Sequence, residues 1–337
     1  MTSFSTDAAT NPPTNPPKKA RPRLVISRRI FDESISALNP HFELLHNQDD
    51  LVLKPEQLAS RAKSADALFV VASDRIDSSF LNAVPTLKII ATGSVGSNHI
   101  DLEHCSKHNI LVSNTPEVLT EATADLAWAL LMATARRVTE SEQWLRSGQW
   151  DRWAFEQFLG KPVYGATLGI VGMGRIGCAI AQRAQGFAMP TIYHNRSTSP
   201  AAQSLGARWV SKDDLLAQAD FLMLVLPYTA QSHHWLDAQA LGKLKTDAIV
   251  INIARGGIVD DAALAQALGQ GRLAGAGLDV YENEPNVNPA LLALKQVVLT
   301  PHIGSATTQS RLAMSMLAAN NLIAWAQGKP LLTAVLN

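Results

Sequence analysis

Short apolar, β-branched runs alternate with helical stretches over the first part of the chain, from Arg23 onward. The runs that read as strands are RLVIS from Arg23, LFVVAS around Leu68, LKIIATG ending at Gly93 and LVSN ending at Asn114. Strands that are separated by helical segments are typical of a parallel sheet, because parallel pairing needs a long crossover connection. This part of the chain therefore predicts a first α/β unit.

The alternation restarts after a long helical pattern from about Glu117 to Arg137 and a Trp-rich stretch. The further strand-like runs are TLGIVG, TIYHN, FLMLVL, AIVINIA, AGAGLDV and VVLTP, the last of them ending at Pro301. Each run ends near a polar or glycine-rich turn, which is where open parallel sheets bind their ligands. They predict a second α/β unit, and residues 307–328 predict one amphipathic helix that returns to the first unit.

Composition and charge narrow the class of protein. A chain of 337 residues with 47% hydrophobic residues suits two compact units with real cores. Lys plus Arg and Asp plus Glu number 29 each, so no net field favours nucleic acid or an anionic membrane. Cys105 and Cys178 are the only cysteines, too few for a disulfide framework or a cysteine metal cluster, so we expect no metal site and a reducing, cytoplasmic compartment. Small-molecule chemistry is the better hypothesis.

Two segments bear on targeting and disorder. Residues 1–20 are rich in Pro, Thr and Asn and contain no apolar signal region, so they predict a disordered tail, whose role the sequence leaves open. The longest apolar stretch, residues 124–135, is too short to span a bilayer and reads as a buried helix. We expect a soluble protein without a membrane partner.

A glycine-rich turn follows the first strand of the second unit. In LGIVGMGRIG, Gly172, Gly174 and Gly177 stand between a hydrophobic run and a helical pattern, which is the GxGxxG context for a dinucleotide. Gly172 permits a tight turn, Gly174 lets the backbone approach a pyrophosphate and Gly177 allows close packing of helix on strand. The alternative is a strand-to-helix turn that binds nothing, but the flanking pattern favours a cofactor loop.

Arg255 is the first candidate catalytic residue. The run AIVINIARGGIVD delivers it into a flexible glycine turn at the carboxyl end of a strand. A guanidinium presents a planar fork of donors that matches a carboxylate bidentately, and one arm can polarise an adjacent ketone oxygen. The alternative is a surface Arg that pairs with Asp260 or Asp261.

Glu284 and His302 follow two later strands, in GAGLDVYENEP and TPHIGSAT. Reduction of a ketone needs a proton for the developing alkoxide, and histidine is the natural donor near neutral pH. A hydrogen bond from His302 to Glu284 would favour the imidazolium and fix the ring. The alternative for His302 is a satisfied histidine at a strand end.

Together these motifs resemble the D-isomer-specific 2-hydroxyacid dehydrogenase family, and most of all its glyoxylate/hydroxypyruvate reductase branch. The resemblance spans residues 23–330 and includes the run NTPEVLTEATADLAWALLMATARR from Asn114 to Arg137. Several independent motifs occur in the order that the family shows.

The resemblance implies that Arg255 binds the substrate carboxylate and carbonyl, and that Glu284 and His302 form the acid–base pair. It also implies that the backbone N–H groups of Val95 and Gly96, in GSVGSNHID, hold the carboxylate. Further positions expected at the cofactor are Arg175, Ile176, Pro227, Asp279 near the nicotinamide amide, and Gly304.

Two departures from the family pattern concern the cofactor. Val225 stands where the family often has His or Asn, so a polar contact is missing there. Where NAD users carry Asp after the second strand of the nucleotide domain, this chain has Asn195, Arg196, Ser197 and Thr198. An acidic residue would repel a 2'-phosphate, whereas Arg196 can bind one, which predicts NADPH in preference to NADH. An Arg196 directed into solvent would instead give an enzyme that also accepts NAD.

The expected fold is α/β, with a doubly wound Rossmann nucleotide-binding domain (116–307) inserted in a smaller flavodoxin-like substrate domain (21–115 and 308–337). The expected reaction is NADPH-dependent reduction of glyoxylate or hydroxypyruvate to the D-2-hydroxy acid, with the proton from His302. The alternatives are a 2-ketogluconate reductase of the same family and a non-catalytic nucleotide-sensing co-regulator. The resemblance implies a homodimer, with the helix near Ala124 and the Trp-rich arm as its interface, although the residues leave a monomer open.

Overall fold

The structure is a computed structural model that describes residues 20–335. The first α/β unit is built on a parallel 5-stranded sheet. The strand order is β2-β1-β3-β4-β5, the order of flavodoxin-like folds. Its strands are β1 (Arg23–Ile26), β2 (Glu43–Leu45), β3 (Ala67–Val70), β4 (Ile89–Thr92) and β5 (Leu111–Ser113). Its helices are α1 (Asp32–Leu38), α2 (Pro55–Ala62), α3 (Ser78–Ala83) and α4 (Leu102–Lys107).

The second unit is a parallel 7-stranded sheet in the order β12-β11-β10-β9-β6-β7-β8. Its strands are β6 (Leu168–Val171), β7 (Thr191–His194), β8 (Arg208–Trp209), β9 (Phe221–Leu224), β10 (Ile249–Asn252), β11 (Gly275–Leu278) and β12 (Val297–Leu299). Its helices are α5 (Thr120–Ala135), α6 (Val138–Arg146), α7 (Arg175–Ala184), η1 (Gln185–Phe187), α8 (Pro200–Ser204), α9 (Lys212–Gln218), α10 (Ala238–Leu241), α11 (Asp261–Gly269) and α12 (Pro289–Leu292). The order reverses between β6 and β9, which is the switch point where doubly wound sheets bind ligands.

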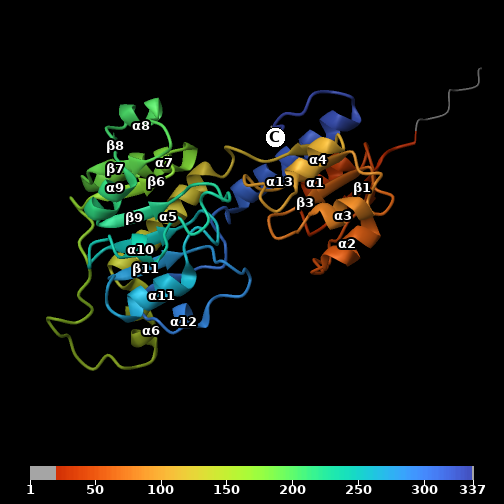
Figure 1. The fold of residues 1–337 in the computed structure, drawn as a ribbon. Helices are drawn as coiled ribbons and strands as arrows, with labels where there is room; N and C mark the ends of the chain where they lie inside the picture. The colour runs from red at the N-terminus through yellow and green to blue at the C-terminus, as the bar shows by residue number, and fades with distance from the viewer. Residues whose placement is uncertain (1–19, 336–337) are drawn as a thin grey trace, which may run out of the picture.

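The two units form separate lobes, and the chain passes between them twice (Figure 1). It leaves the smaller lobe after β5 and returns as α13 (Thr308–Ala326), which packs against α1 and β4. Ala318, Ala319 and Leu322 of α13 are buried against the apolar side chains of β1, β3 and β4. The expected fold class, a doubly wound domain inserted in a flavodoxin-like one, is confirmed.

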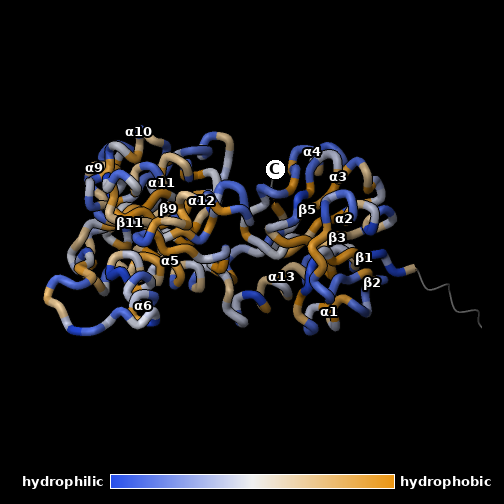
Figure 2. The backbone as a smooth tube through the Cα atoms, turned by 90° about the horizontal axis from the view of Figure 1, so that it is seen from below, coloured by the Kyte–Doolittle hydropathy of each residue, from blue (hydrophilic) through white to orange (hydrophobic). Residues whose placement is uncertain are grey.

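Each lobe has its own hydrophobic core along the central strands (Figure 2). All four residues of β9 and of β10 are buried, as expected for parallel strands covered by helices on both faces. Because the strands supply the core, the polar residues of each unit gather in the loops at the strand ends, where the candidate site lies.

The strand predictions match the structure except at the sheet edges, where β2 and β8 were not predicted. The predicted disordered tail, residues 1–20, lies outside the described residues apart from Ala20. Within residues 20–335, no helix combines the length and the apolar character that a membrane crossing requires.

Candidate active site

Arg255 lies on the turn that follows β10. Asn252, the last residue of that strand, shapes the turn: its Oδ1 accepts a hydrogen bond from Ala254 N (3.1 Å) and its Nδ2 donates to the Arg255 carbonyl (3.3 Å). Glycine is required next, because a Cβ on Gly256 would overlap the backbone carbonyl of Tyr281. The turn therefore packs directly on the segment that follows β11.

Asp260 and Asp261, the alternative partners of Arg255, have other roles. Asp260 caps α11 by accepting a hydrogen bond from Ala263 N (2.9 Å), and buried Asp261 accepts one from Glu282 N (3.0 Å). Neither acid pairs with Arg255 in the part of the chain that the structure describes. The interpretation of Arg255 as their surface partner is therefore wrong.

The guanidinium of Arg255 instead reaches across to the smaller lobe, where it meets the loop that follows β4. Its Nε donates to Asn98 Oδ1 (3.3 Å), and its Nη1 donates to the Ala254 carbonyl (2.7 Å). A Cβ on Gly96 would clash with Nη2 and lie 3.0 Å from Cζ, so the guanidinium rests on the Gly96 backbone. Only glycine allows this close approach.

The N–H groups of Val95 and Gly96 are unpaired: neither donates a hydrogen bond to any group within residues 20–335. Backbone amides at partly buried positions are normally paired, so these two are available for a ligand beside Arg255. Burial lowers the pKa of Arg255 and the nearby charge of Glu284 opposes that shift, but a guanidinium stays protonated in either case. One cation and two amide donors match the needs of a carboxylate.

Glu284 and His302 come from the loops after β11 and β12, and His302 Nδ1 donates to Glu284 Oε2 at 2.7 Å. The other oxygen of Glu284 accepts a hydrogen bond from Tyr281 N (2.9 Å). Burial raises the pKa of Glu284, but the hydrogen bond from His302 and its charge outweigh burial, so the pKa lies below its ordinary value. Because Nδ1 faces the carboxylate, Nε2 is the ring atom left for a ligand.

Asp279 anchors the segment that carries His302. Its Oδ1 accepts hydrogen bonds from Thr300 Oγ1 (2.6 Å) and Ile303 N (2.7 Å), and its Oδ2 accepts one from Gly304 N (2.8 Å). His302 has a φ of 53°, a left-handed conformation that costs a non-glycine residue about 1–3 kcal/mol unless its surroundings impose it. The contacts of Asp279 impose it, although burial raises the pKa of this carboxyl above its ordinary value.

The glycine turn after β6 fits a pyrophosphate. Gly172 has a φ of 99°, and a Cβ there would lie 2.7 Å from Leu226 N, so only glycine can turn this tightly. A Cβ on Gly177 would overlap the Gly172 carbonyl, which keeps α7 close to the strand. Gly174 faces open space, with nothing within 4 Å of its Cβ position. A phosphate can therefore approach the backbone there.

The first turn of α7 supplies donors for that phosphate. The amides of Arg175, Ile176 and Gly177 donate no hydrogen bond within residues 20–335, as is usual for the open end of a helix. The side chain of Arg175 forms an exposed ion pair with Glu117 (3.2 Å), so its guanidinium is engaged while its backbone N–H is not. These amides are the groups that could hold a dinucleotide.

Of the four residues that follow β7, one contacts the glycine turn and three are exposed. Asn195 Oδ1 accepts a hydrogen bond from Met173 N (2.7 Å), so this side chain ties the second strand end to the glycine turn. Arg196, Ser197 and Thr198 are exposed, and Arg196 forms no hydrogen bond or ion pair with any described residue. Its guanidinium is free to meet an anionic group near the end of β7.

Pro227 and Gly304 follow β9 and β12, at the same carboxyl edge of the sheet as Gly172. The Pro227 carbonyl accepts a hydrogen bond from Ser232 Oγ (2.9 Å), and the Gly304 amide is already engaged by Asp279. The contacts of Pro227, Asp279 and Gly304 with a cofactor stay predictions.

Comparison with known proteins fits this geometry. A family model for the NAD binding domain of D-isomer specific 2-hydroxyacid dehydrogenases matches residues 128–304. The chain is 47% identical over 314 residues to a glyoxylate reductase of Thermococcus kodakarensis, which covers 92% of this chain and 94% of that relative. The chain belongs to the D-isomer specific 2-hydroxyacid dehydrogenase family. The resemblance drawn from the motifs is thereby confirmed, and the chain is an oxidoreductase of the class that acts on the CH–OH group of 2-hydroxy acids.

Solved structures of this dehydrogenase family share the whole fold. A D-isomer specific 2-hydroxyacid dehydrogenase from Polaromonas has a TM-score of 0.86 at 39% identity, covering 94% of this chain and 100% of that one. An NADPH-dependent glyoxylate/hydroxypyruvate reductase from Sinorhizobium meliloti, solved with NADP and malonate, has a TM-score of 0.84 at 36% identity, covering 94% and 97%.

Three polar residues near Arg255 were missed from the sequence: Asn98, His99 and Asn252. His99 Nε2 lies 3.0 Å from Thr92 Oγ1, and burial first and the charge of Arg255 second lower the pKa of His99 to about 4. Burial therefore favours the neutral form of His99. The only signal was the polar character of SNHID and of the Asn in VINIARG, at strand ends that are otherwise apolar.

Proposed function

We propose that this dehydrogenase reduces glyoxylate or hydroxypyruvate to the 2-hydroxy acid, with the D configuration where a stereocentre forms. The observation that carries the proposal is the contact of Arg255 with the Gly96 backbone across the two lobes. The charges of Arg255 and Glu284 lie close enough to shift each other's pKa, and Glu284 holds His302. A small molecule with adjacent carboxylate and ketone groups spans such a site.

The residues of the site have defined roles in this proposal. The amides of Val95 and Gly96 and the guanidinium of Arg255 hold the carboxylate, and Arg255 also polarises the ketone oxygen. His302 Nε2 donates a proton to the oxygen as the carbonyl becomes an alkoxide, while Glu284 orients the ring and stabilises the imidazolium. When bound, the nicotinamide cofactor supplies the hydride that adds to the carbonyl carbon. Proton and hydride together convert C=O into CH–OH.

The names of the relatives support the choice of substrate, since glyoxylate or hydroxypyruvate occurs in them. The test is steady-state oxidation of NADPH with glyoxylate, hydroxypyruvate, 2-ketogluconate and hydroxyacetone, which lacks the carboxylate. We expect kcat/KM to be highest for one of the first two and lowest for hydroxyacetone. A higher kcat/KM for 2-ketogluconate would assign that compound as the substrate instead. The absence of turnover with every keto acid would favour the nucleotide-sensing co-regulator.

We infer that NADPH is preferred over NADH. The support is the free guanidinium of Arg196 beside the Ser197 and Thr198 hydroxyls, with Asn195 instead of an acidic residue at the end of β7. A charge-assisted hydrogen bond from Arg196 to the 2'-phosphate would contribute about 1.5–3 kcal/mol, or roughly 10- to 100-fold in kcat/KM. Arg196→Ala should lose that factor with NADPH and leave NADH unaffected. Equal use of both cofactors by the wild type would contradict this inference.

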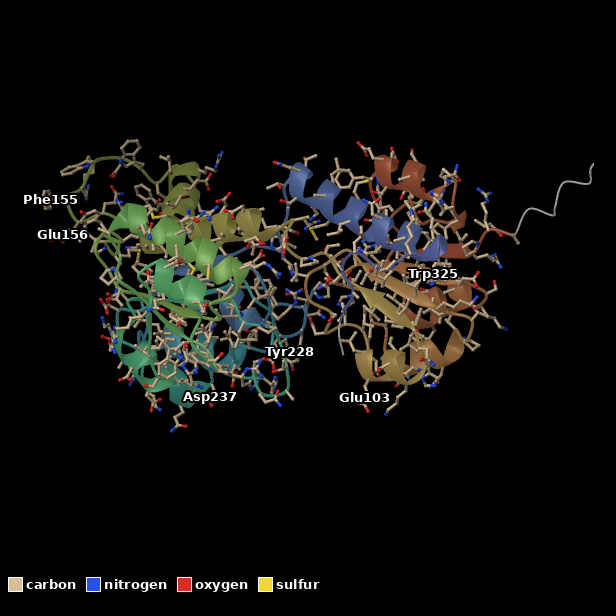
Figure 3. All side chains as sticks on the ribbon, turned by 90° about the horizontal axis from the view of Figure 1, so that it is seen from above. Glu103, Phe155, Glu156, Tyr228, Asp237 and Trp325 are labelled. Carbon is tan, nitrogen blue, oxygen red and sulfur yellow. The ribbon has the colours of Figure 1, made fainter. Side chains whose placement is uncertain are left out.

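We also propose a homodimer built on the nucleotide-binding lobe. The arm after α6 exposes aromatic side chains, with Trp153 at 72%, Phe155 at 84% and Tyr164 at 76% exposure. Phe155 and Glu156 lie at the end of this lobe that is remote from the smaller lobe (Figure 3). Exposed apolar clusters of this kind are typical of protein interfaces, and a second copy would cover them.

A further inference from the structure

Three consecutive carbonyl groups of the loop that carries Val95 and Gly96 are held by hydrogen-bond donors. Thr115 N donates to the Ser94 carbonyl (2.9 Å), Asn114 Nδ2 donates to the Val95 carbonyl (2.8 Å), and Ser94 Oγ donates to the Gly96 carbonyl (2.7 Å). Two of these donors belong to the segment where the chain first leaves the smaller lobe. The connection between the lobes thus holds the loop from one side.

Peptide geometry converts these contacts into a direction for the amides. In a planar trans peptide unit, the C=O group and the N–H group of the next residue point in opposite directions. The Gly96 N–H shares its unit with the Val95 carbonyl, so the side chain of Asn114 determines where the Gly96 N–H points. That N–H belongs to the glycine on which Arg255 rests, and it has no partner within residues 20–335.

Asn114 is itself held by the C-terminal segment. Its backbone N–H donates to the Thr333 carbonyl (3.2 Å), and its carbonyl accepts from Thr333 Oγ1 (2.6 Å). Asn321 of α13, fully buried, then holds Thr333: Asn321 Nδ2 donates to Thr333 Oγ1 (2.8 Å), and Thr333 N donates to Asn321 Oδ1 (3.0 Å). The donors and acceptors form one continuous chain from α13 to the loop.

The same C-terminal segment is fastened along β5. Ala334 forms an antiparallel bridge with Ser113, and Val335 N donates to the Val112 carbonyl (2.8 Å). Thr333 therefore joins α13 to the segment where the chain first leaves the smaller lobe.

We propose that Asn114 is a positioning residue for the substrate carboxylate, and that Thr333 of the C-terminal segment holds Asn114 in place. The chain of contacts from Asn321 through Thr333 and Asn114 to Val95 keeps the Gly96 amide aimed at the ligand beside Arg255. This inference rests on the proposed function, because it takes the carboxylate to bind at Val95 and Gly96.

The test compares Asn114→Ala and Thr333→Val with two matched controls in the smaller lobe. Asn82→Ala changes an exposed asparagine of α3, and Thr86→Val removes a hydroxyl that donates to the Ala65 carbonyl (2.7 Å). Loss of one aligned N–H donor to a carboxylate should raise the KM for glyoxylate about 10- to 100-fold in Asn114→Ala, and less in Thr333→Val. The controls should keep the wild-type KM.

A positioning role predicts further readouts that a general loss of structure would not produce. The Ki of oxamate, a 2-keto acid analogue that is not reduced, should rise by the same factor as the KM. The Kd of NADPH from fluorescence titration and kcat at saturation should stay near wild type. Thr333→Ser, which keeps the hydroxyl, should restore the wild-type KM and Ki.

Unchanged KM and Ki in Asn114→Ala and Thr333→Val would overturn the proposal, as would equal weakening of NADPH binding. If Asn114→Ala does not fold, the pair Thr333→Val and Thr333→Ser decides. Direct titration of oxamate by calorimetry distinguishes failure of the proposed reaction from failure of the proposed role of Asn114. A wild type that binds oxamate but turns over no keto acid contradicts the proposed reaction, whereas variants that bind oxamate as well as the wild type contradict the role of Asn114.

Discussion

Gly96→Ala tests whether the contact between the two lobes builds the carboxylate site. The added Cβ would lie 3.0 Å from Arg255 Cζ and 3.2 Å from Nε, and would clash with Nη2. Non-bonded carbon atoms prefer separations of about 3.5–4.0 Å, so the guanidinium must move by roughly 0.5–1 Å. Gly96 does not have a positive φ, so alanine strains no backbone and the long side chain of Arg255 gives way.

A movement of this size affects catalysis far more than stability. Displacing a substrate-holding group by about 1 Å can cost about 100-fold in rate, so kcat/KM for glyoxylate should fall by about 10- to 100-fold. Most of the loss should appear in KM, because in the proposed function the guanidinium and the amides hold the carboxylate. The free energy of unfolding should change by only about 0.5 kcal/mol, as for a substitution that displaces one flexible side chain.

Gly93→Ala is the matched control in the same loop. Its Cβ would lie 3.5 Å from the Phe69 ring, an ordinary contact, and its φ is not positive either. We expect kcat/KM within about twofold of the wild type for Gly93→Ala, with NADPH binding unchanged in both variants. Wild-type kcat/KM in Gly96→Ala, or equal losses in the two variants, would refute the reasoning, because the effect would not depend on Arg255.

The remaining predictions concern the acid–base pair and the arm. His302→Gln should lower turnover by about 100- to 10,000-fold while the Kd of NADPH stays near wild type; unchanged turnover would end the assignment. Glu284 has a lowered pKa in the folded state, so its stabilising effect is present above its unfolded-state pKa and disappears as pH falls through the folded-state pKa. Glu284→Gln should therefore be less stable than the wild type at neutral pH and equally stable in acid. Its pH–rate profile for reduction should also move to lower pH. A profile identical to that of the wild type would show that Glu284 does not act with His302. Light scattering should show a dimer for the wild type and a monomer for Trp153→Ser with Phe155→Ser, and a monomeric wild type would contradict the interface.

The strand pattern predicted the interior of both sheets because parallel strands covered on both faces are continuously apolar. Phe221–Leu224 and Ile249–Asn252 are examples, with every residue buried. The edge strands Glu43–Leu45 and Arg208–Trp209 were missed, since short strands with one open side carry polar residues and no periodic signal. The domain boundaries at 115/116 and 307/308 and the cytoplasmic location stay predictions.

The candidate site, too, could be predicted from the sequence only in part. Arg255, Glu284 and His302 could be grouped from the sequence because β10, β11 and β12 are consecutive neighbours, so their carboxyl ends lie along one edge. Asn98 and Asn114 could not be added. They belong to the other lobe, and the contact of Asn98 with Arg255 joins positions 157 residues apart, which no local pattern encodes.

The structure also refines how Arg255 could hold a carboxylate. A bidentate fork needs two N–H groups on one edge of the guanidinium. Nη1 is anchored to the Ala254 carbonyl at 2.7 Å, whereas Nε reaches Asn98 Oδ1 at 3.3 Å, beyond the usual range of about 2.7–3.2 Å. The weaker bond is the one that a carboxylate oxygen can replace, so the fork would use the edge of Nε and Nη2. Nη2 already lies against Gly96, so the fork and the Gly96 amide would bind the same carboxylate. The hydrogen bond of Nη1 would keep the guanidinium in place while a carboxylate oxygen replaces Asn98 Oδ1 as the partner of Nε.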